Sequence, residues 1–240
     1  MLEISGVSML ERVWRIAKAA RGASRVVIAT EDERVLVHAA TFGAEAVLTS
    51  DTCTNGTERV AEALDAARIE DDAVINFQGD AVLTPPWVLD EMIAAFSSPS
   101  PFDIVTPAVR LDDEGLAALV EHKRIAPSSG TTVTFDLYGD ALYFSKQIIP
   151  FVRKAGFVAV HRHIGLYGYR CASLRRYVSL PASPLEKTEG LEQLRALENG
   201  MKVRVVVVDY RGRSHGSVDM PADVAVVEAI IAREGELVGA

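Results

Sequence analysis

The sequence predicts an α/β protein built on a mostly parallel, doubly wound sheet. Helical and extended segments alternate through the first half of the chain, and only a few residues connect them. The strand candidates are short apolar runs rich in β-branched residues, which is typical of parallel strands covered on both faces. With 240 residues and no clean linker, the chain is long enough for one large domain. We therefore expect a single domain over residues 1–240.

The first half of the chain repeats a βα pattern. Met1 to Ile4 is too short to predict a strand, and Ser5-Gly6 predicts a turn. Ser8-Met9-Leu10-Glu11 fits a capping box, and the apolar residues after it follow at helical spacing until Gly22. The same box recurs at Thr30-Glu31-Asp32-Glu33. The expected helices cover residues 8–22, 30–41, 57–68 and 85–95, and the expected strands cover residues 25–29, 45–48, 73–77 and 104–108.

The pattern changes near residue 110, where alternating strand candidates replace the βα repeat. These candidates predict a β-rich section between about residues 125 and 170, an extension suited to oligomer contacts. The chain then returns to a helix, an apolar strand and a last helix. In order, the expected elements are a helix over 112–122, strands over 131–136, 140–144 and 162–169, a helix over 183–199, a strand over 203–208 and a helix over 219–233.

Composition excludes several classes of protein. A net charge of −8 and a pI near 5.2 argue against a nucleic-acid-binding surface, although a local basic pocket can still bind an anionic substrate. The two cysteines lie far apart in sequence and indicate neither a disulfide framework nor a metal cluster. A reducing cytoplasm is therefore the expected compartment. No apolar run approaches the roughly 20 residues that a membrane helix needs, so we expect no membrane partner.

The candidate site begins where the central strand ends. The apolar run that starts at Ala73 stops at Gln78-Gly79-Asp80. Open α/β sheets bind their ligands just past the carboxyl ends of strands, and an Asp there is a natural Mg²⁺ ligand when phosphates supply the other oxygens. The alternative is a plain turn, since Gly-Asp is among the commonest turn pairs. The residue types alone leave both interpretations open.

Several further stretches carry polar residues suited to a phosphorylated or hydroxylated ligand. They are Asn55-Gly56-Thr57-Glu58-Arg59, Ala141-Leu142-Tyr143-Phe144-Ser145-Lys146, His163-Ile164-Gly165-Leu166-Tyr167-Gly168-Tyr169-Arg170, the run from Ser183-Pro184-Leu185-Glu186-Lys187 to Arg195, and Ser217-Val218-Asp219-Met220-Pro221. In this order the set resembles the CMP-Kdo synthetases (3-deoxy-manno-octulosonate cytidylyltransferases). The resemblance runs from about Leu2 to the last helix, and the runs at 163–170 and 183–195 are its most specific parts.

The resemblance implies a Rossmann-like nucleotidyltransferase fold and a homodimer built on the β-rich section. It implies transfer of CMP from CTP to Kdo or a closely related acidic sugar, with release of pyrophosphate, for lipopolysaccharide or surface-polysaccharide synthesis. It also implies Mg²⁺ as the cofactor. By the same match, Asp80 and Asp219 are catalytic residues that bind Mg²⁺, Asn55, Thr57, Arg59 and Gln78 bind the nucleotide, and Lys146, His163, Tyr167, Glu192 and Gln193 surround the sugar acid.

These residue types suit the chemistry, because cations stabilise the charge on phosphate oxygens and ring hydroxyls need polar partners. We expect the Asp80 and Asp219 carboxylates to lie within about 6 Å of one another if they share an ion. We expect the five acceptor residues to line a single cleft facing Asp80. Purely structural roles stay open as alternatives. Asp219 suits a helix N-cap, His163 and Tyr167 suit core packing, and Glu192 and Gln193 suit a solvated helix face.

The sequence also departs from the family pattern. The family opens with a strand and an Arg- and Lys-bearing loop that holds the triphosphate, and the match begins after both. Ala81-Val82 replaces the usual Glu-Pro, and Lys146 replaces an Arg. We therefore expect the first strand and the phosphate loop to be absent, which would weaken CTP binding and stability. Two further readings stand beside the active enzyme: a non-catalytic relative that keeps the dimeric scaffold, and a CMP-transferase for another small acid such as a phosphonate.

Overall fold

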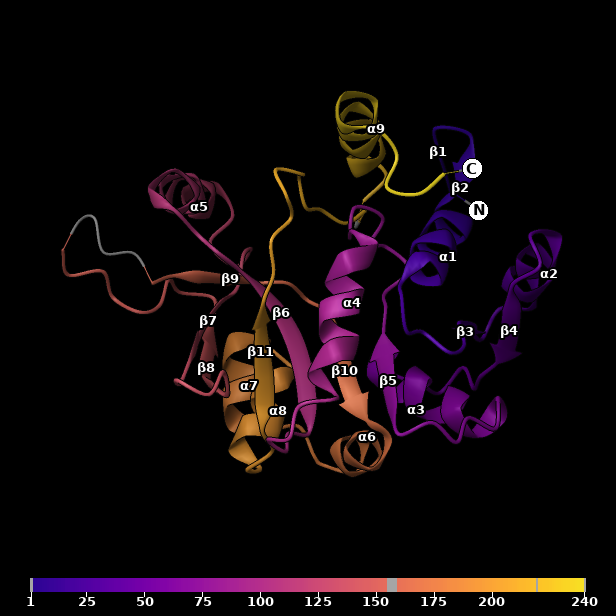
Figure 1. The fold of residues 1–240 in the computed structure, drawn as a ribbon, viewed down its shortest axis with the longest axis horizontal. Helices are drawn as coiled ribbons and strands as arrows, with labels where there is room; N and C mark the ends of the chain where they lie inside the picture. The colour runs from indigo at the N-terminus through magenta and orange to yellow at the C-terminus, as the bar shows by residue number, and fades with distance from the viewer. Residues whose placement is uncertain (1, 155–158, 219, 240) are drawn as a thin grey trace. The chain divides into compact units, whose positions relative to one another are not determined.

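The structure is a computed structural model that describes residues 2–154, 159–218 and 220–239. It contains two compact units (Figure 1). The first unit comprises Met1–Ala94 and Tyr210–Ala240, and the second comprises Ala95–Asp209.

The first unit follows the predicted βα pattern closely. Its elements are β1 (Glu3–Ile4), β2 (Val7–Ser8), α1 (Met9–Ala19), β3 (Val27–Thr30), α2 (Glu33–Thr41), β4 (Glu45–Leu48), α3 (Gly56–Ala66), β5 (Ala73–Asn76), α4 (Pro86–Ala95) and α9 (Asp223–Glu234). Ser5 and Gly6 turn β1 into β2 with positive φ values, which confirms the predicted turn. Ser8 caps α1 by accepting a hydrogen bond from the Glu11 backbone N–H at 3.2 Å, and Asp32 caps α2 in the same way. The helix starts are therefore set by local sequence.

The core of this unit joins segments that are far apart in sequence. Buried side chains from β1, α1, the turn after Asp80 and α9 pack into one apolar cluster that contains Ile4, Val13, Val82, Leu83, Val218 and Val227. In the part of the chain that the structure describes, β3 pairs with β4 in parallel and has no second strand neighbour. Burial of this cluster fixes the turn after β5 against the C-terminal segment.

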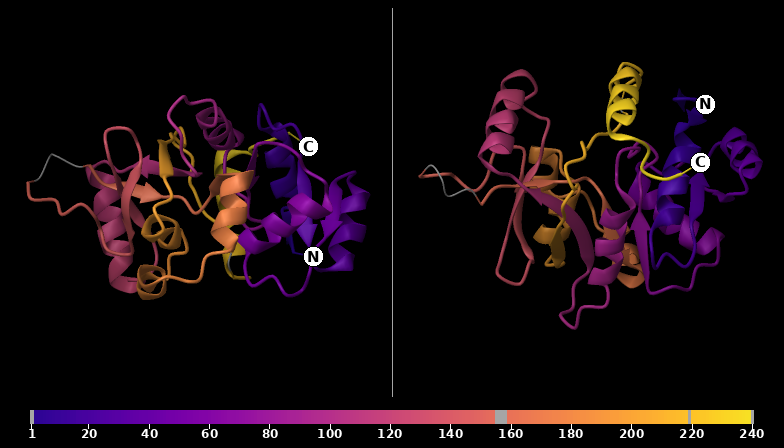
Figure 2. Two further views of the ribbon diagram at one scale, coloured as in Figure 1. Left: turned by 90° about the horizontal axis from the view of Figure 1, so that it is seen from below. Right: turned by 45° about the horizontal axis from the view of Figure 1, so that its top comes forward.

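The second unit is built around β6. Its elements are β6 (Ile104–Arg110), α5 (Asp113–Ile125), β7 (Thr132–Phe135), β8 (Ala141–Ser145), β9 (His161–His163), β10 (Tyr167–Arg170), α6 (Cys171–Val178), α7 (Pro184–Glu189), α8 (Gln193–Glu198) and β11 (Val203–Val207). β6 is a long strand with β11 along one edge and β9 and β10 along the other (Figures 1 and 2). β9 pairs with β7, which pairs with β8, so the strands predicted over 131–136 and 140–144 are confirmed and form an antiparallel hairpin.

A bulge divides the strand that the sequence predicts over 162–169. His163 pairs with Ala108 and Gly168 pairs with Val105, so residues 164–167 of one strand lie opposite residues 106–107 of the other. The extra residues form a bulge between β9 and β10. Gly168 has to be glycine, because a Cβ at this position would lie 2.7 Å from Val105 Cγ1. The bulge changes which side chains of this segment point into the sheet.

Three other sequence expectations need correction. The predicted mostly parallel sheet is wrong for the described strands: β3–β4 and β6–β11 are parallel, whereas β1–β2, β6–β9, β6–β10, β7–β8 and β7–β9 are antiparallel. The helix predicted over 183–199 is two short helices, since Gly190 adopts a left-handed conformation with φ 65°. The sequence pattern did not predict α6.

Within the described residues, no helix has both the length and the apolar character needed to cross a membrane.

Candidate active site

The first unit places the nucleotide-side residues at the end of β5. Asn76 is the last residue of β5, and Gln78, Gly79 and Asp80 form the turn that follows. The Asp80 carbonyl accepts hydrogen bonds from the backbone N–H groups of Val82 at 2.8 Å and Val218 at 3.1 Å. The turn is therefore tied to the segment just before position 219. Asp219 itself lies outside the described residues, so its distance from Asp80 stays a prediction.

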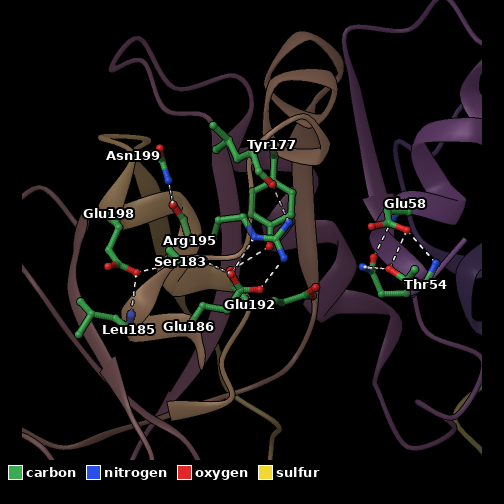
Figure 3. A network of polar contacts seen from close by, with 12 residues as sticks. Thr54, Glu58, Tyr177, Ser183, Leu185, Glu186, Glu192, Arg195, Glu198 and Asn199 are labelled. Carbon is green, nitrogen blue, oxygen red and sulfur yellow. Dashed lines mark hydrogen bonds and ion pairs between the residues drawn. The ribbon is translucent and has the colours of Figure 1, made fainter. Parts of the chain in front are cut away.

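The start of α3 is closed by reciprocal capping. Asn55 Oδ1 accepts from the Glu58 backbone N–H at 2.9 Å. The Glu58 carboxylate in turn accepts from the Thr54 N–H at 2.7 Å and the Thr54 hydroxyl at 2.8 Å (Figure 3). This arrangement resembles a capping box, except that the Glu58 carboxylate accepts from the N–H of Thr54, one residue before the cap Asn55. The Asn55 side chain thus orders the loop, and its predicted contact with the nucleotide would have to be made alongside that role.

Gln78 lies directly against the start of α3. A Cβ on Gly56 would come within 2.8 Å of Gln78 Nε2, so a larger residue here would displace the Gln78 side chain. Gln78 Nε2 donates to Asn76 Oδ1 at 3.1 Å, and this bond orients the Gln78 amide. Asn76 is 4% exposed, and its Nδ2 has no partner among the described residues. A buried donor without a partner is costly, so this amide pair is suited to binding a polar ligand.

The other two predicted nucleotide residues are engaged inside the unit. Arg59 forms an ion pair with Glu31 at 2.6 Å and donates to the Thr49 hydroxyl at 2.7 Å. It therefore braces the loop after β4 against α3. Thr57 is 1% exposed and lies in the interior. Arg59 thus supports the loop, and the predicted nucleotide contacts of both residues stay predictions.

In the second unit, the bulge between β9 and β10 is held by a buried threonine. Thr106 Oγ1 lies 2.7 Å from both the Leu166 carbonyl oxygen and His163 Nε2. A hydroxyl has one hydrogen, and a carbonyl can only accept, so the hydrogen goes to Leu166 and Oγ1 accepts from His163 Nε2–H. Burial, reinforced by the Lys146 charge, lowers the pKa of His163 to about 3. The imidazole is therefore neutral near pH 7, with Nδ1 as an acceptor.

Tyr167 and Gln193 form a buried pair. The Tyr167 hydroxyl donates to Gln193 Oε1 at 2.9 Å, and burial raises the pKa of Tyr167 well above its usual value. Gln193 is 3% exposed. Its Nε2 has no partner among the described residues. The tyrosine thus fixes the amide so that a donor is left over, which a ligand hydroxyl or carboxylate could satisfy.

Residues that the sequence analysis did not assign a role in the site hold Gln193 in place. Arg195 binds the Glu186 carboxylate through two nitrogens, at 2.8 and 2.5 Å, and its guanidinium lies 5.0 Å from the centre of the Tyr177 ring (Figure 3). The Tyr177 hydroxyl donates to the Glu192 carbonyl oxygen at 2.8 Å. The Ser183–Glu186 spacing of a capping box, which the sequence analysis did not use, was the available signal, because the box places Glu186 where it can reach α8.

The structure brings the predicted acceptor residues of this unit together. The His163 and Tyr167 ring centres are 5.6 Å apart. Lys146 acts electrostatically on His163, and Glu192 acts on Tyr167, so both charges lie near the pair. Among the described residues, no group of three or more His, Cys, Asp or Glu side chains is arranged to hold a metal ion. This neighbourhood is therefore a polar, partly cationic site suited to an anionic, hydroxylated ligand.

The neutral His163 predicts a specific dependence of stability on pH. The folded pKa lies below the unfolded value of 6.5, so the unfolded chain binds more protons as the pH falls and stability is lost between pH 6.5 and about 3. We expect the free energy of unfolding to drop by about 2 kcal/mol more for the wild type than for His163→Gln between about pH 7.5 and 5. Urea denaturation at several pH values measures both curves. Parallel curves would contradict the buried, neutral assignment.

Comparison with known proteins identifies the family. The family model described as Cytidylyltransferase matches residues 1–203. The chain is 50% identical over 236 residues to a 3-deoxy-manno-octulosonate cytidylyltransferase of Maricaulis maris, covering 98% of this chain and 91% of that protein. It is 34% identical over 231 residues to an 8-amino-3,8-dideoxy-manno-octulosonate cytidylyltransferase of Shewanella pealeana, covering 95% and 90%.

A solved structure agrees with the sequence matches. The structure of a CMP:2-keto-3-deoxy-manno-octonic acid synthetase complexed with CTP superimposes with a TM-score of 0.85 at 30% identity. The superposition covers 97% of this chain and 91% of that one, so the shared fold extends over nearly all of the sequence. Sequence and fold agree: the chain belongs to the 3-deoxy-manno-octulosonate cytidylyltransferase family of nucleotidyltransferases.

Proposed function

We propose that this protein transfers CMP from CTP to Kdo or a closely related acidic sugar and releases pyrophosphate, in the cytoplasm, for lipopolysaccharide synthesis. The observation that carries the proposal is the 50% identity with the Maricaulis maris relative over 98% of the chain. The structure supports it with a polar neighbourhood around His163, Tyr167 and Gln193 that has an unpaired buried donor. We take residues 1–240 to act as one cytidylyltransferase domain.

Each unit contributes residues with a distinct role. In the first unit, the Asn76–Gln78 amide pair and the capped loop at Asn55 would contact the cytosine and ribose. In the second unit, Lys146 would bind the sugar carboxylate, while Tyr167 and Gln193 would bind hydroxyl groups. His163 would accept a hydrogen bond from the sugar at Nδ1, because its Nε2–H is held by Thr106. The contacts to the sugar would orient its anomeric hydroxyl for attack on the α-phosphate of CTP.

A magnesium ion is the cofactor that this family typically uses. Carboxylate oxygens are the ligands that Mg²⁺ prefers, with phosphate oxygens completing its shell. Asp80 fits this requirement, because it follows a strand end and its carbonyl is bonded to the N–H of Val218. Asp80 and Asp219 would hold the ion. When bound, the ion would stabilise negative charge on the phosphates during the displacement.

The related acceptor class is a second candidate. The Shewanella pealeana relative, named for an 8-amino-3,8-dideoxy sugar, matches this chain at 34% identity. An amino group in place of a hydroxyl changes charge at one end of the acceptor only, so both sugars could use the same carboxylate contacts. The 50% match favours Kdo over the amino sugar.

A substrate panel distinguishes the candidates. The purified protein would be assayed for pyrophosphate release with CTP, Mg²⁺ and each of Kdo, 8-amino-3,8-dideoxy-manno-octulosonate and a small phosphonate. We expect Kdo to give the highest kcat/KM and the phosphonate to give no signal above hydrolysis. Release that is greatest with the amino sugar would reassign the acceptor. No release with any acceptor would favour the non-catalytic relative.

We also propose a homodimer that uses the β-rich section between residues 125 and 170. The hairpin of β7 and β8 and the segment after it expose large apolar side chains: Leu137, Tyr138, Leu142 and Phe151. Leu142, on β8, is 64% exposed. Grouped apolar side chains at the surface of a protein are typical of interaction sites.

Replacing Leu142 tests this assembly. We expect the wild type to sediment as a dimer at micromolar concentration and Leu142→Glu to sediment as a monomer, because the added charge would be buried in the interface. Val37→Glu is the matched control, since Val37 is 70% exposed on α2 of the first unit. A monomeric wild type, or equal effects of the two variants, would contradict the proposed interface.

A further inference from the structure

Lys146 follows β8, and its peptide group is held from both sides by charged side chains. Its backbone N–H donates to Glu189 Oε2 at 2.8 Å. Its carbonyl oxygen accepts a hydrogen bond from Lys123 Nζ, which also donates to the Ser129 carbonyl at 2.8 Å. Among the described residues, no acidic side chain forms an ion pair with the Lys146 ammonium group. The main chain of this residue is therefore fixed while its charge stays available.

Glu189 is fixed by the hydrogen bonds of its carboxylate and by its place at the end of α7. Its Oε1 accepts from the Ser145 hydroxyl at 2.8 Å, and the Ser145 oxygen accepts from the Gln147 N–H at 2.9 Å. Glu189 is the last residue of α7, and Gly190 closes that helix with its N–H bonded to the Glu186 carbonyl. Because Arg195 holds Glu186, the helix that presents Glu189 cannot shift easily. One carboxylate thus fixes two consecutive residues at the end of β8.

The charged groups around Glu189 indicate that its carboxylate does more than hold the end of β8. Lys123, Lys146 and Arg162 form a cationic group, and burial with repulsion from the other two lowers the pKa of Lys123. Glu189 opposes that repulsion. A carboxylate so close to the cations should weaken binding of an anion by charge alone. Its two hydrogen bonds, from the Ser145 hydroxyl and the Lys146 N–H, therefore indicate a geometric function that offsets this electrostatic cost.

We propose that Glu189 is a positioning residue for the acceptor: it fixes the Ser145–Lys146 corner so that the Lys146 ammonium meets the sugar carboxylate. This inference rests on the proposed function, in which Lys146 binds that carboxylate. Glu189 does not touch the substrate. Its removal should raise the KM for the sugar acid and leave the KM for CTP unchanged.

Three substitutions separate geometry from charge. Glu189→Ala leaves the Lys146 N–H without its acceptor, and the KM for Kdo should rise about tenfold to a hundredfold. Glu189→Asp keeps the charge but is too short to reach both donors, so its KM should also rise. Glu189→Gln keeps the reach: Oε1 accepts from Lys146, and Nε2 donates to Ser145. Its KM should stay within about threefold of wild type or fall, because a negative charge is removed.

A double-mutant cycle with Lys146→Met completes the test. In that background, Glu189→Ala should add little further change in the KM for Kdo, since the group it positions is gone. Lys187→Ala, on an exposed position of the same helix, is the control, and thermal melting monitors folding. If Glu189→Ala does not fold, Glu189→Asp carries the same comparison.

The results for Lys146→Met and for the Glu189 variants distinguish the positioning role of Glu189 from the proposed role of Lys146. A raised KM in Lys146→Met with an unchanged KM in Glu189→Ala and Glu189→Asp would overturn the positioning role alone. An unchanged KM in Lys146→Met would overturn the proposed role of Lys146, and the inference with it. A rise in Glu189→Gln as large as in Glu189→Ala would also count against the geometric role.

Discussion

Asp80→Asn should lower kcat by several orders of magnitude while the protein folds normally. The substitution keeps the size of the side chain and removes its negative charge, so a divalent cation loses a carboxylate ligand next to the phosphates. The backbone of the turn should survive, because its bonds to Val82 and Val218 use the Asp80 carbonyl and not the side chain. Pyrophosphate release across a Mg²⁺ titration measures the loss.

Asp72→Asn is the matched control for this prediction. Asp72 is an exposed carboxylate at the other end of β5 and loses the same charge without touching the turn. We expect its kcat to stay within about twofold of wild type, as is usual for surface substitutions. An Asp80→Asn enzyme with near wild-type kcat would remove Asp80 from the metal site.

Gln193→Leu should reduce kcat/KM for the sugar acid by about a hundredfold or more. The variant removes the buried Nε2 donor that we assign to the acceptor, and a site built to bond a hydroxyl loses that much when the partner is missing. It also leaves the Tyr167 hydroxyl without its acceptor, which should cost about 1–3 kcal/mol of stability. Steady-state kinetics and urea unfolding measure the two effects.

Adding Tyr167→Phe separates those effects. The double variant has no unpaired hydroxyl, so its stability should recover relative to Gln193→Leu. Its activity should stay low, because the Gln193 donor is still absent. If activity recovered together with stability, Gln193 would be a core residue and not an acceptor ligand.

Local sequence predicted the element positions well, because caps and turns act over three or four residues. Ser8, Asp32 and Ser183 cap helices close to where the pattern placed them, and Gly190 ends α7 although the helix was expected to continue. Strand direction was predicted less well. Whether two strands run parallel depends on partners far away in sequence, such as the antiparallel β10 beside β6, and apolar runs alone do not encode this.

In the candidate site, too, the sequence predicted residues but not the long-range contacts that they make. The predicted residues Tyr167 and Gln193 are hydrogen-bonded to each other, whereas their contact with the acceptor stays a prediction. The ion pair between Arg59 and Glu31 was not predicted, because a sequence shows that a cation is present but not which carboxylate lies beside it. Thr106 and Glu189 were missed for a related reason. Their function depends on a bulge and a helix end that form only in the folded chain.

The most direct test of the central claim is phosphorus NMR of a reaction that contains the protein, CTP, Mg²⁺ and Kdo. We predict a new phosphodiester resonance from CMP joined to the sugar, together with an equal amount of pyrophosphate, since the anomeric hydroxyl displaces pyrophosphate from the α-phosphate. Free CMP with pyrophosphate would mean that water and not the sugar is the acceptor. A spectrum of unchanged CTP would contradict the assigned reaction.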